Sequence, residues 1–151
     1  MAEKETKEER LDRELEELLQ ELRLALPGVQ ILFGFLLVVP FNNRFAQTDD
    51  LERDVWFAAL LLALGAVACF IAPTAYHRIR FREYDKERLV TTATRLALAG
   101  LVLLGAALSA SAYVVTGFVF DDGTAAVVTA LAAVTIAGLW FALPLARKVY
   151  G

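Results

Sequence analysis

The chain has 151 residues, of which 58% are hydrophobic, with a mean hydropathy of +0.52 and a formal net charge of −3. A soluble domain is usually nearer half apolar, so this composition indicates that a membrane is the solvent for much of the chain. At this length we expect one domain and exclude a large multi-part machine.

The charged residues leave four long segments empty. All 15 Lys/Arg and all 18 Asp/Glu fall outside residues 24–43, 55–76, 96–120 and 123–146. Each segment has about 20 residues or more, the length that crosses a hydrocarbon core as a helix. A soluble bundle would have a polar face on every helix, and these segments have none. We therefore predict an all-α integral membrane protein, a bundle of four transmembrane helices in residues 24–151.

Residues 1–23 predict a separate, cytoplasmic amphipathic helix. Thr6 and Glu9 have the spacing of a capping box that opens a helix. One helical face carries the leucines Leu11, Leu15, Leu18, Leu19 and Leu22. Pro27 predicts a bend where this helix meets the first span.

The N-terminal helix has two interpretations. It could lie on the membrane surface, but residues 1–23 hold nine acids and five bases, and anionic head groups repel a negative segment. It could instead pack on protein, either its own loop at residues 77–95 or a second copy. That loop has six bases and three acids, so its charge is complementary, and we favour this interpretation.

Basic residues predict the orientation. Thirteen Lys/Arg lie in the N-terminal segment, in the loop between spans two and three, and in the C-terminal tail, whereas the other side has Arg44 and Arg53. Basic residues stay preferentially in the cytoplasm, so both termini are expected there.

The two halves of the chain share a pattern. Residues 23–28 (Arg-Leu-Ala-Leu-Pro-Gly) recur at 95–100 as Arg-Leu-Ala-Leu-Ala-Gly, and Phe70 with Pro73 aligns with Phe141 and Pro144 after a slip of one residue. The pattern fits two parallel helical hairpins, although spans rich in leucine and alanine also match by chance.

Five residues are candidates for a functional role. Gln30, the most polar residue in the first span, could line a pore, or could form a hydrogen bond between helices. At the end of the second span, Tyr76, His77 and Arg78 are typical of a membrane interface, although a histidine could also sense pH. Arg95, like Arg23 at the equivalent position of the repeated pattern, could pair with Glu21 or Glu87, could bind lipid phosphate, or could simply extend to the interface.

Chemistry in the remaining sequence is sparse. Span three carries Ser109, Ser111, Tyr113 and Thr116, which could line a route for ions but could equally bond to their own helix. Gly105/Ser109 and Ala133/Ala137 have the small-residue spacing that favours helix contact. Neither a nucleophile motif nor a metal-binding motif is found, so we expect no enzyme activity, no cofactor and no metal.

Three segments together resemble a known family. They are residues 21–30 (Glu-Leu-Arg-Leu-Ala-Leu-Pro-Gly-Val-Gln), 72–78 (Ala-Pro-Thr-Ala-Tyr-His-Arg) and 85–90 (Asp-Lys-Glu-Arg-Leu-Val). The chain resembles a family of small bacterial four-helix membrane proteins, common in actinobacteria and known as a domain of unknown function. The resemblance implies a location in the bacterial inner membrane and no established activity.

Two functions from different classes remain open. The first is a non-enzymatic scaffold or regulator of a membrane partner, self-associating as a homo-oligomer such as a dimer. The second is a small oligomeric channel or ion/proton transporter, which is less favoured because ionisable residues usually mark such pathways at membrane depth and the spans have none. The bilayer is the expected environment, and no nucleic acid is expected as a partner.

Overall fold

The computed structural model describes residues 6–79 and 86–150. Within these residues the chain is all-helical and contains no strand. Two 3₁₀ segments separate the first two long helices. A π-helical segment, η3, joins the fourth long helix to a short C-terminal helix. In chain order the elements are α1 (Lys7–Val38), η1 (Val39–Phe41), η2 (Asn43–Gln47), α2 (Asp50–Ile79), α3 (Lys86–Gly117), α4 (Asp122–Ala137), η3 (Gly138–Ala142) and α5 (Leu143–Tyr150).

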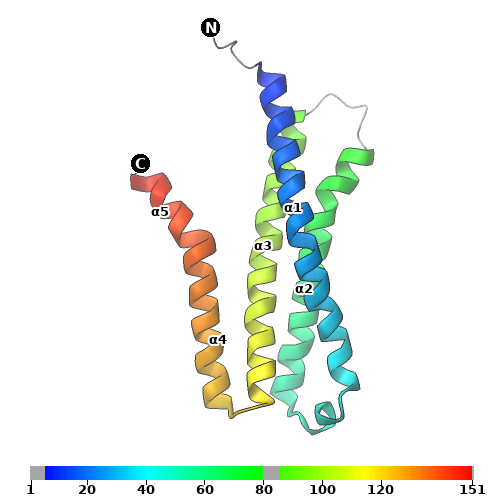
Figure 1. The fold of residues 1–151 in the computed structure, drawn as a ribbon, viewed down its shortest axis with the longest axis vertical. Helices are drawn as coiled ribbons and strands as arrows, with labels where there is room; N and C mark the ends of the chain where they lie inside the picture. Colours follow the sequence, from blue (N-terminus) through cyan, green and yellow to red (C-terminus); the bar gives the residue numbers. More distant parts are fainter. Residues whose placement is uncertain (1–5, 80–85, 151) are drawn as a thin grey trace.

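Four helices are long and apolar enough to cross a membrane. The stretches that qualify are Lys7–Phe41, Asp50–Tyr76, Lys86–Gly117 and Asp122–Ala146. Their ends gather at two opposite ends of the molecule (Figure 1). At one of these ends, α1 and α3 begin and α2 and α5 finish; we call it the N-terminal end. We call the opposite end the far end.

Helix α1 combines the predicted N-terminal helix and the first span in one element. The capping box is confirmed, because the Glu9 amide donates to Thr6 Oγ1 and the Thr6 amide donates to Glu9 Oε2 at 2.8 Å. The helix continues through Pro27 to Val38 without a break at residue 23. The predicted bend at Pro27 therefore does not end the helix. The charged segment before residue 24 and the apolar segment after it form one continuous helix.

The buried face of α1 repeats every seven residues. Leu15, Leu22, Val29 and Leu36 are its buried residues. A strict seven-residue period keeps a seam facing its neighbours along two supercoiled helices. Here the seam lies against α2 and α3, so α1 is held along its length by these two helices.

Helices α2 and α3 pack together through small residues. Ala59, Ala63 and Ala66 are buried on α2, and Phe70 is completely buried against Gly100 of α3. A Cβ atom added at Gly100 would lie 2.6 Å from Phe70 Cδ1, a distance that real Cβ atoms essentially never show. Glycine at position 100 therefore makes room for the ring of Phe70.

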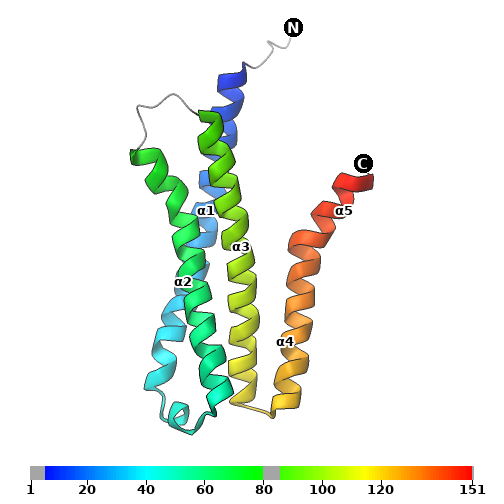
Figure 2. The same cartoon turned by 180° about the vertical axis from the view of Figure 1, so that it is seen from behind.

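Helix α4 stands outside the group formed by the other three long helices. It contacts α3 but neither α1 nor α2, and Figures 1 and 2 show it beside α3 on the side away from α1. The fold is therefore three packed helices with a fourth attached to α3, instead of the expected four-helix bundle. The physical reason is that α1 fills the groove between α2 and α3, so the two hydrophobic clusters close without α4.

The start of α4 is capped by a neighbouring side chain. Asp121 caps α4, where its carboxylate accepts from the Thr124 hydroxyl at 2.8 Å and from the Thr124 amide at 3.1 Å. These hydrogen bonds hold the pKa of the Asp121 carboxyl below its usual range. Near the other end of this helix, η3 precedes Pro144, whose ring nitrogen cannot donate to the helix.

Candidate functional site

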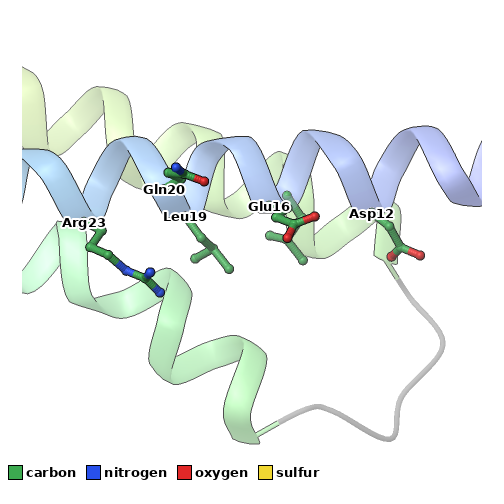
Figure 3. A pocket seen from close by; sticks show the side chains of 6 residues that line it. Asp12, Glu16, Leu19, Gln20 and Arg23 are labelled. Carbon is green, nitrogen blue, oxygen red and sulfur yellow. The ribbon is translucent and has the colours of Figure 1, made fainter.

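A polar cavity opens on α1 near the N-terminal end. It has a volume of about 350 Å³ and is lined by Asp12, Leu15, Glu16, Leu19, Gln20 and Arg23. We call it the α1 pocket. In Figure 3 the side chains of Asp12, Glu16, Leu19 and Arg23 project from the side of α1 that faces the end of α2. The same helix that carries the buried heptad seam thus presents a charged face beside it.

Two ion pairs hold the charged part of α1 against the start of α3. Lys86 Nζ lies 2.8 Å from the Asp12 carboxylate, and Lys7 Nζ lies 2.6 Å from Glu87 Oε2. All four side chains are exposed, so each pair contributes at most about 1 kcal/mol and weakens with salt. The charged helix therefore contacts its own chain at these points, which is one of the arrangements expected from its charge.

A second cavity lies at the far end. Its volume is about 320 Å³. It is lined by residues from the α1–α2 connection, the start of α2, the last residue of α3 and the α3–α4 connection, namely Arg44, Gln47, Thr48, Glu52, Gly117, Phe118 and Val119. Arg44 Nη1 donates to the Phe118 carbonyl at 3.4 Å, and the Thr48 hydroxyl donates to the Phe45 carbonyl at 2.8 Å. The first bond ties the α1–α2 connection to the α3–α4 connection, and the second lies within the α1–α2 connection.

Apolar side chains fill the space among α1, α2 and α3 between the two cavities. One cluster is built on Leu22, Val29, Ala66 and Phe70. A second is built on Leu36, Ala59, Ala63 and Ala107. These two clusters fill the space among the three helices with apolar side chains where they lie.

The structure does not gather the predicted candidates into one site. Gln30 is exposed, although its neighbour Val29 is completely buried, and Arg78 and Arg95 are exposed. Tyr76 is half-buried near the end of α2. Neither the α1 pocket nor the far-end cavity is lined by any of these four residues. The side chain of His77 lies outside the described part of the chain.

Two of the hydroxyl groups of span three, those of Ser109 and Ser111, form hydrogen bonds to their own helix. Ser109 donates to the Gly105 carbonyl at 2.9 Å, and Ser111 donates to the Ala107 carbonyl at 2.7 Å. Both bonds run back one turn, as serine hydroxyls in apolar helices commonly do. The hydroxyl donors of the two serines are thus used within α3. Gly105 itself is a helix contact, as its small-residue spacing predicted, because a Cβ there would lie 2.9 Å from Ile136 Cγ2 of α4.

Trp56 has a role that sequence reasoning missed. Its indole Nε1 donates to the Leu36 carbonyl of α1 at 2.9 Å, and its ring packs edge-on against Phe45 with centroids 5.1 Å apart. The last carbonyls of a helix have no intrahelical donor, so this bond satisfies one of them from a neighbouring helix. A tryptophan in the second turn of α2 was visible in the sequence, but its acceptor is set by tertiary packing.

Neither a metal centre nor an assignable activity emerges from these residues. In the described ranges no three His, Cys, Asp or Glu side chains lie close enough together to hold a metal ion. Residues 4–144 match the model of a family described as "Family of unknown function (DUF6328)". No curated protein and no solved structure matches the chain.

Proposed function

We propose that this chain, which belongs to the DUF6328 family of unknown function, is an integral protein of the bacterial cytoplasmic membrane that acts without catalysis. It crosses the membrane four times, with both termini in the cytoplasm. Its role is that of a scaffold or regulator, which self-associates and binds a membrane partner through its helices. No cofactor takes part.

Membrane insertion is supported by the length and exposure of the four apolar helices. Large apolar side chains are exposed along α1, α2, α3 and α4, including Phe35, Leu61 and Leu131. A soluble monomer rarely exposes contiguous apolar surface on this scale. The hydrocarbon core of a bilayer covers such a surface, and the charged ends of the helices then lie in the two aqueous phases.

The open surface of α4 is the observation that carries the scaffold proposal. Within α4 Ala125 is the buried residue, and the helix contacts α3 alone among the long helices. Four exposed alanines recur at intervals of four, three and four residues along α4, at Ala126, Ala130, Ala133 and Ala137. Small residues at this spacing let two membrane helices approach closely. This alanine stripe can therefore receive a helix from a second copy or from another membrane protein.

The channel is the second candidate, and the geometry favours it less. Apolar side chains fill the described interior, and Gln30 is exposed outside it. A pore lined by Gln30 would have to form between copies of the chain. Backbone carbonyls and hydroxyl groups can line such a pore, so the hypothesis needs a direct test.

Cross-linking in native membranes tests the scaffold proposal. In a Cys69→Ala background, Ala130→Cys should form a covalent adduct with a second copy or another membrane protein. Leu131→Cys is the matched control, because it is an exposed position on the same helix outside the alanine stripe. Equal adducts from both positions, or none from either, would contradict a specific contact.

Ion flux separates the two candidates. Purified protein in liposomes, given sodium, potassium and proton gradients separately, should pass no more ions than empty liposomes. Flux above this control that falls with Gln30→Leu would favour the channel over the scaffold.

A further inference from the structure

We infer that the α1 pocket binds the head group of an aminophospholipid such as phosphatidylethanolamine, an inference that rests on the membrane insertion proposed above. The ligand chemistry is a zwitterion, in which a phosphate ester and a primary ammonium group are joined by a short linker. The pocket provides a cation, an acid and an apolar wall in the order that this ligand requires.

Among the described residues, the pocket has one charge of each sign without an ion-pair partner. Asp12 is paired with Lys86 at 2.8 Å. Glu16 and Arg23 have no ion pair among the described residues. Arg23 can donate two parallel hydrogen bonds to a phosphate, and the Glu16 carboxylate can accept from an ammonium. The remaining charges therefore match a zwitterion better than they match a simple anion or a simple cation.

Helical geometry places the two charged side chains on the same face of α1. Glu16 and Arg23 are seven residues apart on one face of α1, about 10 Å along the axis. Figure 3 shows both side chains on the side of α1 that faces the end of α2. Leu19 lies between them along the helix, and it lines the pocket together with Leu15, so both can contact the two methylene groups that link the phosphate to the ammonium. The volume of about 350 Å³ is in the range of small-ligand pockets.

The position along α1 matches the depth of lipid head groups. Arg23 is the last charged residue before the uncharged segment 24–43. If that segment occupies the hydrocarbon core, Arg23 lies at the phosphate level and Glu16 lies above it in the head-group and aqueous region. A lipid whose acyl chains run beside α1 would then carry its head group into the α1 pocket.

The charge of the segment also selects among lipids. Nine acids and five bases in residues 1–23 disfavour an anionic head group such as phosphatidylglycerol. A choline group has no N–H to donate to Glu16, whereas a primary ammonium has three hydrogens. The pocket should therefore prefer ethanolamine over choline and glycerol head groups.

Native mass spectrometry of lipids retained by the full-length protein tests the inference. The protein is reconstituted in vesicles of equal parts phosphatidylethanolamine, phosphatidylcholine and phosphatidylglycerol, and the lipids that remain bound after extraction are counted. We expect ethanolamine lipid to be retained preferentially. Glu16→Gln and Arg23→Gln should each lower that retention about tenfold, the equivalent of about 1.4 kcal/mol.

Two variants with matched charge changes serve as controls. Glu21→Gln removes an exposed acid of the same helix, and Arg95→Gln removes the arginine that precedes the third uncharged segment. Neither residue lines the pocket. Both should retain ethanolamine lipid as the unaltered protein does. Equal loss in all four variants, or equal retention of the three lipids, would overturn the inference.

Two further arms distinguish a bound lipid from a soluble zwitterion and from a simple anion. Free glycerophosphoethanolamine should displace the lipid only in large excess, because it lacks the acyl chains that hold a lipid beside α1. Complete displacement at a concentration equal to that of the lipid would identify a soluble zwitterion as the ligand and overturn the lipid assignment. Preferential retention of phosphatidylglycerol that depends on Arg23 alone would replace it with an anion site. Resistance of the protein to alkaline extraction from membranes is measured in parallel. Loss of that resistance would reject insertion itself, whereas a failure of lipid selectivity alone would leave insertion intact.

Discussion

Gly28 and Gly100 occupy equivalent positions in the repeated pattern, but their surroundings differ. A Cβ at Gly28 would meet nothing within 4 Å, whereas at Gly100 it would clash with the completely buried ring of Phe70. The sequence repeat therefore is not accompanied by equal packing at this pair. The two glycines share a sequence context, but Phe70 of α2 packs against Gly100, whereas Gly28 is exposed.

Gly100→Ala should lower the free energy of unfolding by about 1–3 kcal/mol, because the added methyl overpacks a rigid contact. Gly28→Ala is the matched control and should raise it by up to about 1 kcal/mol, since alanine is the better helix former. Denaturant titration of both variants in detergent measures the difference. Equal changes in the free energy of unfolding from the two substitutions would show that Phe70 does not pack against Gly100.

Trp56→Phe tests the hydrogen bond between α2 and α1. Loss of the indole donor leaves the buried Leu36 carbonyl without this bond, which should cost about 1–3 kcal/mol. The free energy of unfolding in detergent is again the measurement. Trp140→Phe is the control, because the described hydrogen bonds include none from its indole. Similar losses from the two substitutions would indicate that ring size, and not the bond to Leu36, is responsible.

At the scale of elements, sequence patterns predicted where the helices lie in the chain better than they predicted which helices pack together. Absence of charge located the four apolar stretches, and the Thr6–Glu9 spacing located the start of α1. The patterns could not predict that α1 continues past Pro27, because the packing of the heptad seam on α2 and α3 offsets the loss of one backbone bond. They also could not give the position of α4, since each of its faces is apolar and none identifies a neighbour.

The attachment of α4 to α3 depends on Gly105. A Cβ at this position would lie 2.9 Å from Cγ2 of Ile136, a β-branched side chain with little freedom to move. Gly105→Ala should therefore displace α4 and cost about 1–3 kcal/mol. Distances between spin labels on α3 and α4 should lengthen, while those between α2 and α3 stay unchanged, because α4 contacts α3 alone among the long helices.

A double-mutant cycle with Ile136→Ala tests whether this contact is the cause. Removing the Cγ2 methyl should make Gly105→Ala less costly, with a coupling energy of about 0.5–3 kcal/mol. Strict additivity of the two substitutions would mean that the clash does not exist and that the label distances need another cause.

At the scale of the whole molecule, the candidate site was the least predictable feature. Gln30 attracted attention because it is the most polar residue of the first span, yet it is exposed on α1. The α1 pocket instead gathers residues that in the sequence belong to an ordinary charged helical face. Their significance depends on which side of α1 faces the end of α2, and this is fixed by the register of the buried seam, not by residue type.

The orientation of the whole molecule in the membrane gives the last prediction. The start of α1, the end of α2, the start of α3 and the end of α5 lie at one end of the molecule, so a single placement puts all four on one side (Figure 1). That end carries thirteen Lys/Arg in sequence, against Arg44 and Arg53 at the other. A reporter fused after Ala46 should therefore be active outside the cytoplasm, and one fused after Gly151 should be active inside it.

Deletion of residues 1–20 makes the test stricter. It removes four of the thirteen bases, Lys4, Lys7, Arg10 and Arg13, and leaves nine against two. The orientation should survive, because the loop after α2 and the C-terminal tail still carry most of the positive charge. Reporter signals that exchange sides in the shortened protein would assign the orientation to the N-terminal segment. Signals from both fusions on the same side would contradict an odd number of spans between Ala46 and the C-terminal tail, and with it the four-span arrangement.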